Sequence, residues 1–178
     1  MSAPPLVVIL MGSNSDLGHA QAITAALDEL GIAHETRVGS AHKTPAHVLA
    51  LLAAYQAEPR PLVYITIAGR SNALSGFVDA QVTEPVIACP PASSAFAGAD
   101  IYSSLRMPSG VAPAVVLEPA GAALLAAKML GLGDEAIRER VAARQRAAGE
   151  RILADDAGLA AGDEVAPAGG GNEDERAA

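Results

Sequence analysis

The chain has 178 residues, enough for one globular domain with a substantial core but with little room for a second. Its net charge of -8 is unevenly placed, because residues 155–178 hold seven acidic residues and one arginine while residues 1–154 carry a net charge of only -2. No basic run occurs and aromatic residues make up 3% of the chain, so the composition argues against nucleic acid as a partner.

Short apolar runs alternate with helical patterns, which is typical of a parallel sheet covered by helices. In chain order the patterns predict strands and helices at these residues: strand 6–10, helix 17–30, strand 34–38, helix 45–55, strand 62–67, helix 74–81, strand 85–89, strand 114–117, helix 120–130 and helix 134–154. Gly31 suits the C-cap of the first helix, and Thr44 with Pro45 suits the start of the second. Five strands separated by helices indicate an α/β protein with an open, doubly wound sheet.

The two ends of the chain differ from its body. Residues 1–154 are expected to form a single domain, whereas the acidic tail at 155–178 has too few large apolar side chains to offset the entropy of ordering it. We therefore expect a disordered tail. The N-terminus lacks a charged leader, and no stretch approaches the roughly 20 apolar residues of a membrane-spanning helix. A cytoplasmic protein without a membrane partner is expected.

Polar loops follow each of the first three predicted strands. They are MGSNSD (11–16), GSAHKTP (39–45) and AGRSNALSG (68–76). If the strand order is 2-1-3-4-5, these loops meet at the carboxyl edge of the sheet, where α/β proteins bind ligands. The first loop brings serine hydroxyls and free N–H groups to a helix start, which suits an anion, and Lys43 in the second is one of only two lysines.

Each polar residue also has a simpler explanation. Ser15 or Asp16 could merely cap the first helix, and Arg70 could pair with a surface acid. Cys89, the only cysteine, excludes an intrachain disulfide or a zinc site built on several thiolates. Because no evident base accompanies it, we expect Cys89 to act as a small buried hydrophobe and not as a nucleophile.

Histidine is the side chain best suited to proton transfer near neutral pH. The chain has four histidines, and His19, His34 and His47 are interpreted as structural or solvated. His42 is favoured as a general acid or base because its loop lies between the possible phosphate site and the sheet edge.

Three motifs, in this order and on this strand pattern, resemble the phosphoribosylaminoimidazole carboxylase family of purine biosynthesis: MGSNSD, SAHKTP and SSLRMPSG (103–110). The resemblance runs from about Leu6 to Leu130. It implies a flavodoxin-like three-layer α/β/α sandwich with strand order 2-1-3-4-5 and a C-terminal helix. It also implies an octamer whose active sites form where subunits meet, and chemistry that needs no metal or redox cofactor.

The resemblance also separates two classes of the family. The mutase class usually has a glycine- and alanine-rich segment with a second histidine after the third strand, and arginine in place of the lysine of SAHKTP. AGRSNALSG, SAHKTP and VIACPP (86–91) are instead similar to the class that carboxylates aminoimidazole ribonucleotide (AIR) at C4 with carbon dioxide, as in the animal bifunctional enzyme. We therefore expect reversible, ATP-independent formation of 4-carboxy-AIR (CAIR).

Carried over by position, the resemblance makes His42 the catalytic residue that handles the proton transfers. It places Ser13 and Asp16 at the ribose phosphate portion of the substrate, with Ser40 and Lys43 near its phosphate. The other residues expected at the substrate are Gly12, Ser15, Gly69, Arg70, Ser71, Asn72 and Arg106. Donors near Ser71 and Asn72 are expected to stabilise the developing carboxylate, and Ser103, Ser104 and Ser109 share a loop with Arg106.

Three other functions stay open from the sequence. The nearest is an N5-carboxy-AIR mutase, which shares the phosphate contacts and differs mainly in the loop at 68–76. A non-catalytic sugar-phosphate-binding module of flavodoxin-like fold is a second alternative. The third is an oligomerising scaffold without a ligand, which the convergence of three polar loops disfavours.

Overall fold

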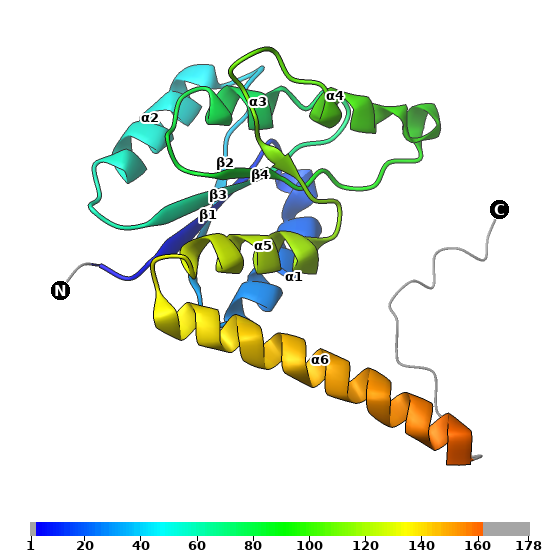
Figure 1. Ribbon diagram of the computed structural model, residues 1–178. Coiled ribbons are helices and arrows are strands. Elements are labelled where there is room, and N and C mark those ends of the chain that lie inside the picture. Colours follow the sequence, from blue (N-terminus) through cyan, green and yellow to red (C-terminus); the bar gives the residue numbers. More distant parts are fainter. Residues whose placement is uncertain (1–2, 162–178) are drawn as a thin grey trace. The chain divides into compact units, whose positions relative to one another are not determined.

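The computed structural model describes residues 3–161, and its centre is a sheet of parallel strands (Figure 1). The strands lie in the order β2-β1-β3-β4-β5, which confirms the predicted topology. The inner strands β1 and β3 are buried along their whole length, as their continuous apolar sequences predict. The strand bounds are β1 (Leu6–Met11), β2 (Ala33–Val38), β3 (Leu62–Ile67), β4 (Val86–Ala88) and β5 (Ala114–Val115).

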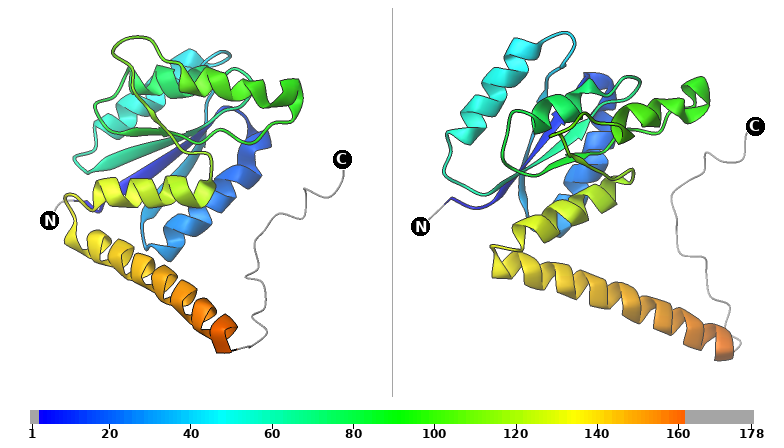
Figure 2. Two further views of the ribbon diagram at one scale, coloured as in Figure 1. Left: turned by 45° about the vertical axis from the view of Figure 1, so that its right-hand side comes forward. Right: turned by 45° about the horizontal axis from the view of Figure 1, so that its top comes forward.

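Helices cover both faces of this sheet (Figures 1 and 2). Alternate residues of β1 and β3 pack on α1 (Leu17–Glu29) and α5 (Pro119–Leu130) on one face. On the other face the intervening residues pack on α2 (Pro45–Gln56) and α3 (Ala73–Asp79). The predicted three-layer α/β/α sandwich is therefore confirmed. The C-cap of α1 is Leu30, and the predicted Gly31, with a φ of 62°, comes one position later and ends the helix.

The long connection between β4 and β5 holds two short helices that the sequence did not predict. They are the 3-10 helix η2 (Ala95–Ile101) and α4 (Tyr102–Leu105). Within η2 three consecutive residues adopt left-handed backbone, Phe96 (φ 50°), Ala97 (φ 52°) and Gly98 (φ 76°). A backbone of this kind does not place apolar residues at a helical or strand spacing. The apolar pattern of the sequence therefore did not predict η2.

The last helix, α6 (Glu135–Ala161), extends past the predicted end at 154. The expectation of disorder is therefore wrong for residues 155–161, where alanine and leucine favour a helix over the acidic character of the segment. The remainder of the predicted tail, 162–178, lies outside the described residues. The described chain forms one compact unit up to Val141 and a second at 142–161. Among residues 3–161 we find no helix with the length and apolar character needed to cross a membrane.

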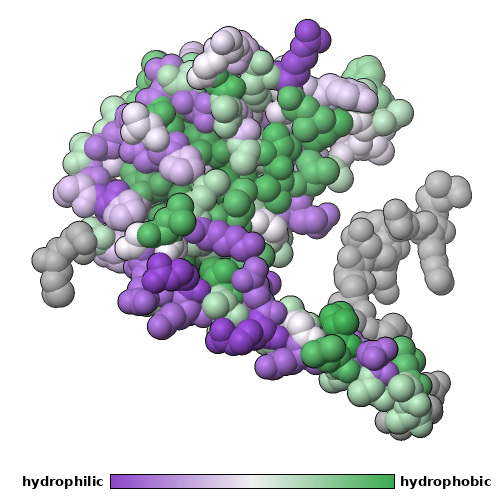
Figure 3. All heavy atoms as spheres, in the orientation of Figure 1, coloured by the Kyte–Doolittle hydropathy of each residue, from purple (hydrophilic) through white to green (hydrophobic). Residues whose placement is uncertain are grey.

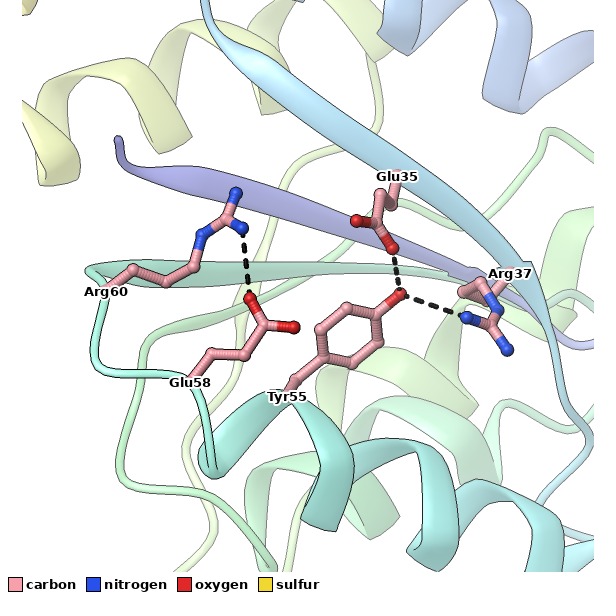
Figure 4. A network of polar contacts seen from close by, with 5 residues as sticks. All are labelled: Glu35, Arg37, Tyr55, Glu58 and Arg60. Carbon is pink, nitrogen blue, oxygen red and sulfur yellow. Dashed lines mark hydrogen bonds and ion pairs between the residues drawn. The ribbon is translucent and has the colours of Figure 1, made fainter. Parts of the chain in front are cut away.

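A polar network fastens the edge strand β2 to α2 (Figure 4). The buried Tyr55 donates a hydrogen bond of 2.6 Å from its hydroxyl to Glu35 Oε2, and Arg37 Nη1 donates to the same hydroxyl at 3.5 Å. Glu35 and Arg37 are two residues apart on β2 and therefore share a face of the sheet. Burial and the bond to Glu35 raise the pKa of Tyr55 to about 12.

We expect Tyr55→Phe to lower the free energy of unfolding by roughly 1 to 2 kcal/mol at pH 8, because it removes a hydrogen bond to a charged group. Since the folded-state pKa is above the unfolded value of 10.0, this residue's contribution is present below pH 10 and is lost as the pH rises toward about 12. Urea unfolding followed by circular dichroism at pH 8 and pH 11 measures both effects.

The variant should lose less stability than the wild type between these two pH values. Tyr102→Phe is the matched control, because Tyr102 is 70% exposed. Burial also raises the pKa of Tyr64, and that contribution persists in both variants. Equal pH dependence in the wild type and Tyr55→Phe would contradict the role given to Tyr55.

Candidate functional site

The first three strands end level with one another, which brings their polar loops together. In the strand register, Met11 at the end of β1 lies opposite Val38 of β2 and Ile67 of β3. The next backbone groups continue the ladder, since Gly12 N donates to Ile67 O and Gly39 N donates to Met11 O, both at 2.8 Å. The loops that begin at residues 12, 39 and 68 therefore start side by side, as predicted.

The loop after β1 is organised around Ser13. This residue is extended and caps the short 3-10 helix η1 (Asn14–Asp16), accepting a hydrogen bond of 3.2 Å from Ser15 N. Ser15 Oγ lies 3.0 Å from Ser13 Oγ. Asp16 has the N-cap position of α1 that the helix-capping explanation gave it, but its side chain makes no capping hydrogen bond. Gly12 and Asp16 are half-buried at the sheet edge.

The loop after β2 is closed on itself and presents its two basic residues outward. Thr44 Oγ1 accepts from Ser40 N at 3.0 Å, and Ser40 Oγ accepts from Lys43 N at 3.2 Å. Thr44 therefore stands at the predicted N-cap position of α2, but its hydroxyl binds Ser40 and not the helix. A Cβ at the buried Gly39 would lie 2.9 Å from Val48 Cγ2, so glycine is needed where the loop begins. His42 and Lys43 are exposed.

The loop after β3 bends sharply at Arg70, which has a φ of 58°. Arg70 and Ser71 are exposed and Gly69 is half-buried, but Asn72 is only 3% exposed. The Asn72 side chain accepts from Ser75 N at 3.2 Å as the N-cap of α3 and donates to Ser104 Oγ at 2.9 Å. The Asn72 side chain is therefore bonded within the fold, and Ser71 is the exposed member of the pair near which donors to the developing carboxylate are expected.

The predicted basic residues are free to meet a ligand. Within residues 3–161, the side chains of His42, Lys43, Arg70 and Arg106 take part in no hydrogen bond or ion pair. Arg106 is exposed and follows α4 directly. All four side chains are exposed, and their chemistry suits a polar, anionic molecule.

A cavity of about 390 Å³ lies at the opposite edge of the sheet. It is bordered by residues that precede or begin the strands, among them Pro5, Arg60, Pro61 and Pro85. No predicted site residue lines it. The carboxyl edge therefore remains the candidate site, because the three polar loops begin side by side there.

Sequence reasoning missed one pair of side chains. His19 Nε2 on α1 lies 3.3 Å from Cys89 Sγ, 70 residues away in the sequence, so the expectation that no base accompanies Cys89 is wrong. Burial nevertheless raises the pKa of Cys89 to about 12, and burial lowers the pKa of His19. Both groups are neutral at pH 7, so Cys89 behaves as the buried, unreactive residue that was predicted.

Comparisons with known proteins agree with this arrangement. The family model for AIR carboxylase matches residues 6–151. A phosphoribosylaminoimidazole carboxylase of Treponema denticola is 57% identical over 155 residues, which cover 87% of this chain and 98% of that protein. A phosphoribosylaminoimidazole carboxylase of Archaeoglobus fulgidus is 55% identical over 134 residues, covering 75% of this chain and 73% of that protein.

A solved structure agrees as well. The crystal structure of Treponema denticola PurE superposes with a TM-score of 0.86 at 57% identity, over 87% of this chain and 98% of that one. The residues that the family model matches include all three polar loops. The chain belongs to the AIR carboxylase family, PurE, of purine biosynthesis.

Proposed function

We propose that this protein carboxylates AIR at C4 with carbon dioxide, giving CAIR without ATP. The observation that carries the proposal is the loop after β3, AGRSNALSG, which begins beside the loop after β1 and keeps Arg70 and Ser71 exposed. The lysine of SAHKTP and the printed names of the two relatives, both carboxylases, point in the same direction.

The substrate is held through its ribose phosphate. Lys43 supplies a positive charge for the phosphate, with hydroxyls from Ser13 and Ser40 as further hydrogen-bonding groups. Asp16, at the start of α1, can accept hydrogen bonds from ribose hydroxyls. These contacts hold the aminoimidazole ring and carbon dioxide together, which removes much of the entropic cost of a reaction between two small molecules.

The reaction needs one carbon–carbon bond and one proton transfer. The aminoimidazole is an enamine, so electron density at C4 attacks the carbon of carbon dioxide, and a C=O electron pair moves onto oxygen to give a carboxylate. C4 still carries its proton at this stage. His42 accepts that proton, the C–H electron pair restores the aromatic ring, and the exposed imidazolium then releases the proton to solvent.

The proposal is tested by supplying purified protein with AIR plus bicarbonate and, in parallel, with N5-carboxy-AIR, both without ATP. We expect rapid CAIR formation from the first mixture, saturating in carbon dioxide. Product from the second mixture alone would make the protein a mutase. Product from neither, together with calorimetric binding of AIR, would leave a sugar-phosphate-binding module.

We also infer that the chain assembles with copies of itself, as an octamer. Phe96, Tyr102 and Leu105 are 85%, 70% and 57% exposed, and Figure 3 shows apolar residues gathered between α4 and α5. Asp100 Oδ2 is buried without a hydrogen-bond partner among the described residues. A second copy on η2 and α4 would bury the apolar groups and could supply that partner. Light scattering should give about eight times the chain mass of 17.9 kDa, and a stable monomer would contradict the inference.

A further inference from the structure

Two loops of the candidate site are joined by a small cluster of hydrogen bonds, which we call the Asn72 latch and define as Asn72, Ser103 and Ser104. Asn72 N donates to Ser103 Oγ and Asn72 Nδ2 donates to Ser104 Oγ, both at 2.9 Å. Ser103 and Ser104 lie 31 and 32 positions after Asn72 in the sequence. The latch therefore joins the end of the loop after β3 to α4.

Two of the three latch residues are buried, Ser103 is half-buried, and the polar groups of Asn72 are hydrogen-bonded. Asn72 is 3% exposed and Ser104 is 1% exposed. The second polar atom of the Asn72 amide, Oδ1, accepts from Ser75 N in the first turn of α3. Because a buried polar group that loses its partner is strongly disfavoured, this arrangement specifies one relative placement of the two loops.

The latch also acts on the backbone of Arg70. Ser103 Oγ lies 3.3 Å from Arg70 O and 2.7 Å from Asp100 O, and its single proton can go to either carbonyl. Arg70 has a φ of 58°, a left-handed conformation that residues other than glycine adopt only when their surroundings hold them there. Ser103 Oγ contacts both Arg70 O and Asn72 N, just after this bend, and these contacts supply that restraint.

We propose that Ser103 and Ser104 are positioning residues that act through Asn72 to set the direction of Arg70 and Ser71 toward the carbon dioxide end of the substrate. This inference rests on the proposed function, in which the loop after β3 forms that end of the site. Arg106 lies two residues beyond Ser104. The latch therefore holds the backbone close to two exposed guanidinium groups, those of Arg70 and Arg106. Two such groups suit the carboxylate that the reaction creates.

Limited trypsin digestion tests the latch without using the reaction. Because Arg70 is exposed but tightly held, cleavage after it should be slow in the wild type. We expect Ser103→Ala and Ser104→Ala to speed cleavage after Arg70 at least tenfold, measured by mass spectrometry, while cleavage after Lys43 is unchanged. Ser103→Thr, which keeps the hydroxyl, should restore the slow rate. Ser94→Ala is the control, because Ser94 is exposed and outside the latch.

Kinetics test the positioning role. Both alanine variants should lower kcat/KM for carbon dioxide about tenfold and leave KM for AIR within about twofold. The double variant Asn72→Ala with Ser104→Ala should have the same kcat/KM for carbon dioxide as Asn72→Ala alone, because Ser104 acts through Asn72. Unchanged cleavage after Arg70 would overturn the latch. Faster cleavage would overturn the positioning role if kcat/KM fell equally for carbon dioxide and AIR. The same holds if a lower melting temperature of the variants explained the fall in kcat/KM. If the wild-type protein is cleaved slowly after Arg70 but makes no CAIR, the proposed function is wrong. The latch would then remain only as a restraint on the loop after β3.

Discussion

Replacement of His42 by asparagine is expected to lower the turnover number at least about 100-fold, the lower end of what proton-transfer catalysis contributes. His42 is exposed, in a loop that Ser40 and Thr44 close without its help, so the substitution should leave the fold intact. Asparagine keeps hydrogen-bonding capacity but cannot carry the C4 proton at neutral pH. Steady-state rates with saturating AIR and carbon dioxide, together with calorimetric affinity for AIR, measure the two effects separately.

His47→Asn is the matched control, since His47 is also exposed and lies five residues away in the first turn of α2. It should keep wild-type turnover and a similar melting temperature. If His42→Asn turned over as fast as the wild type, His42 would have no part in the mechanism. If the substitution abolished AIR binding in the same proportion as activity, His42 would be a binding residue and not the base.

The strands themselves could be predicted from local patterns, whereas their order came from the family resemblance. β1 and β3 are short, continuous apolar runs, and parallel strands joined by helices restrict the order of a five-stranded sheet to few choices. The positions of the three polar loops followed from that order, since strands that end level bring their loops together. Whether His42 and Lys43 perform the chemistry given to them stays a prediction.

What the sequence did not predict depends on contacts between distant residues. The partner of Cys89 is 70 positions away, and no spacing rule connects it with His19. Asn72 reads as a polar loop residue, yet Ser75 and Ser104 turn its amide inward. The path of η2 is set by three left-handed residues in a row, a conformation that leaves no period in the sequence.

Lys43→Met is expected to raise KM for AIR by roughly 10- to 100-fold with little change in kcat, because a hydrogen bond to a charged group is worth about 1.5 to 3 kcal/mol. The loop should survive the substitution, since it is the backbone N–H of Lys43 that donates to Ser40 Oγ. Initial rates over a range of AIR concentrations give both constants.

The chain offers a matched control for the loss of one positive charge. Lys128, the other lysine, is exposed in the last turn of α5, at the opposite end of the sheet from the candidate site, so Lys128→Met should leave KM unchanged. Salt gives a second criterion, because an exposed ion pair weakens as ionic strength rises. KM of the wild type should therefore increase with salt more steeply than KM of Lys43→Met. Equal salt dependence, or a fall in kcat without a change in KM, would mean that Lys43 does not bind the phosphate.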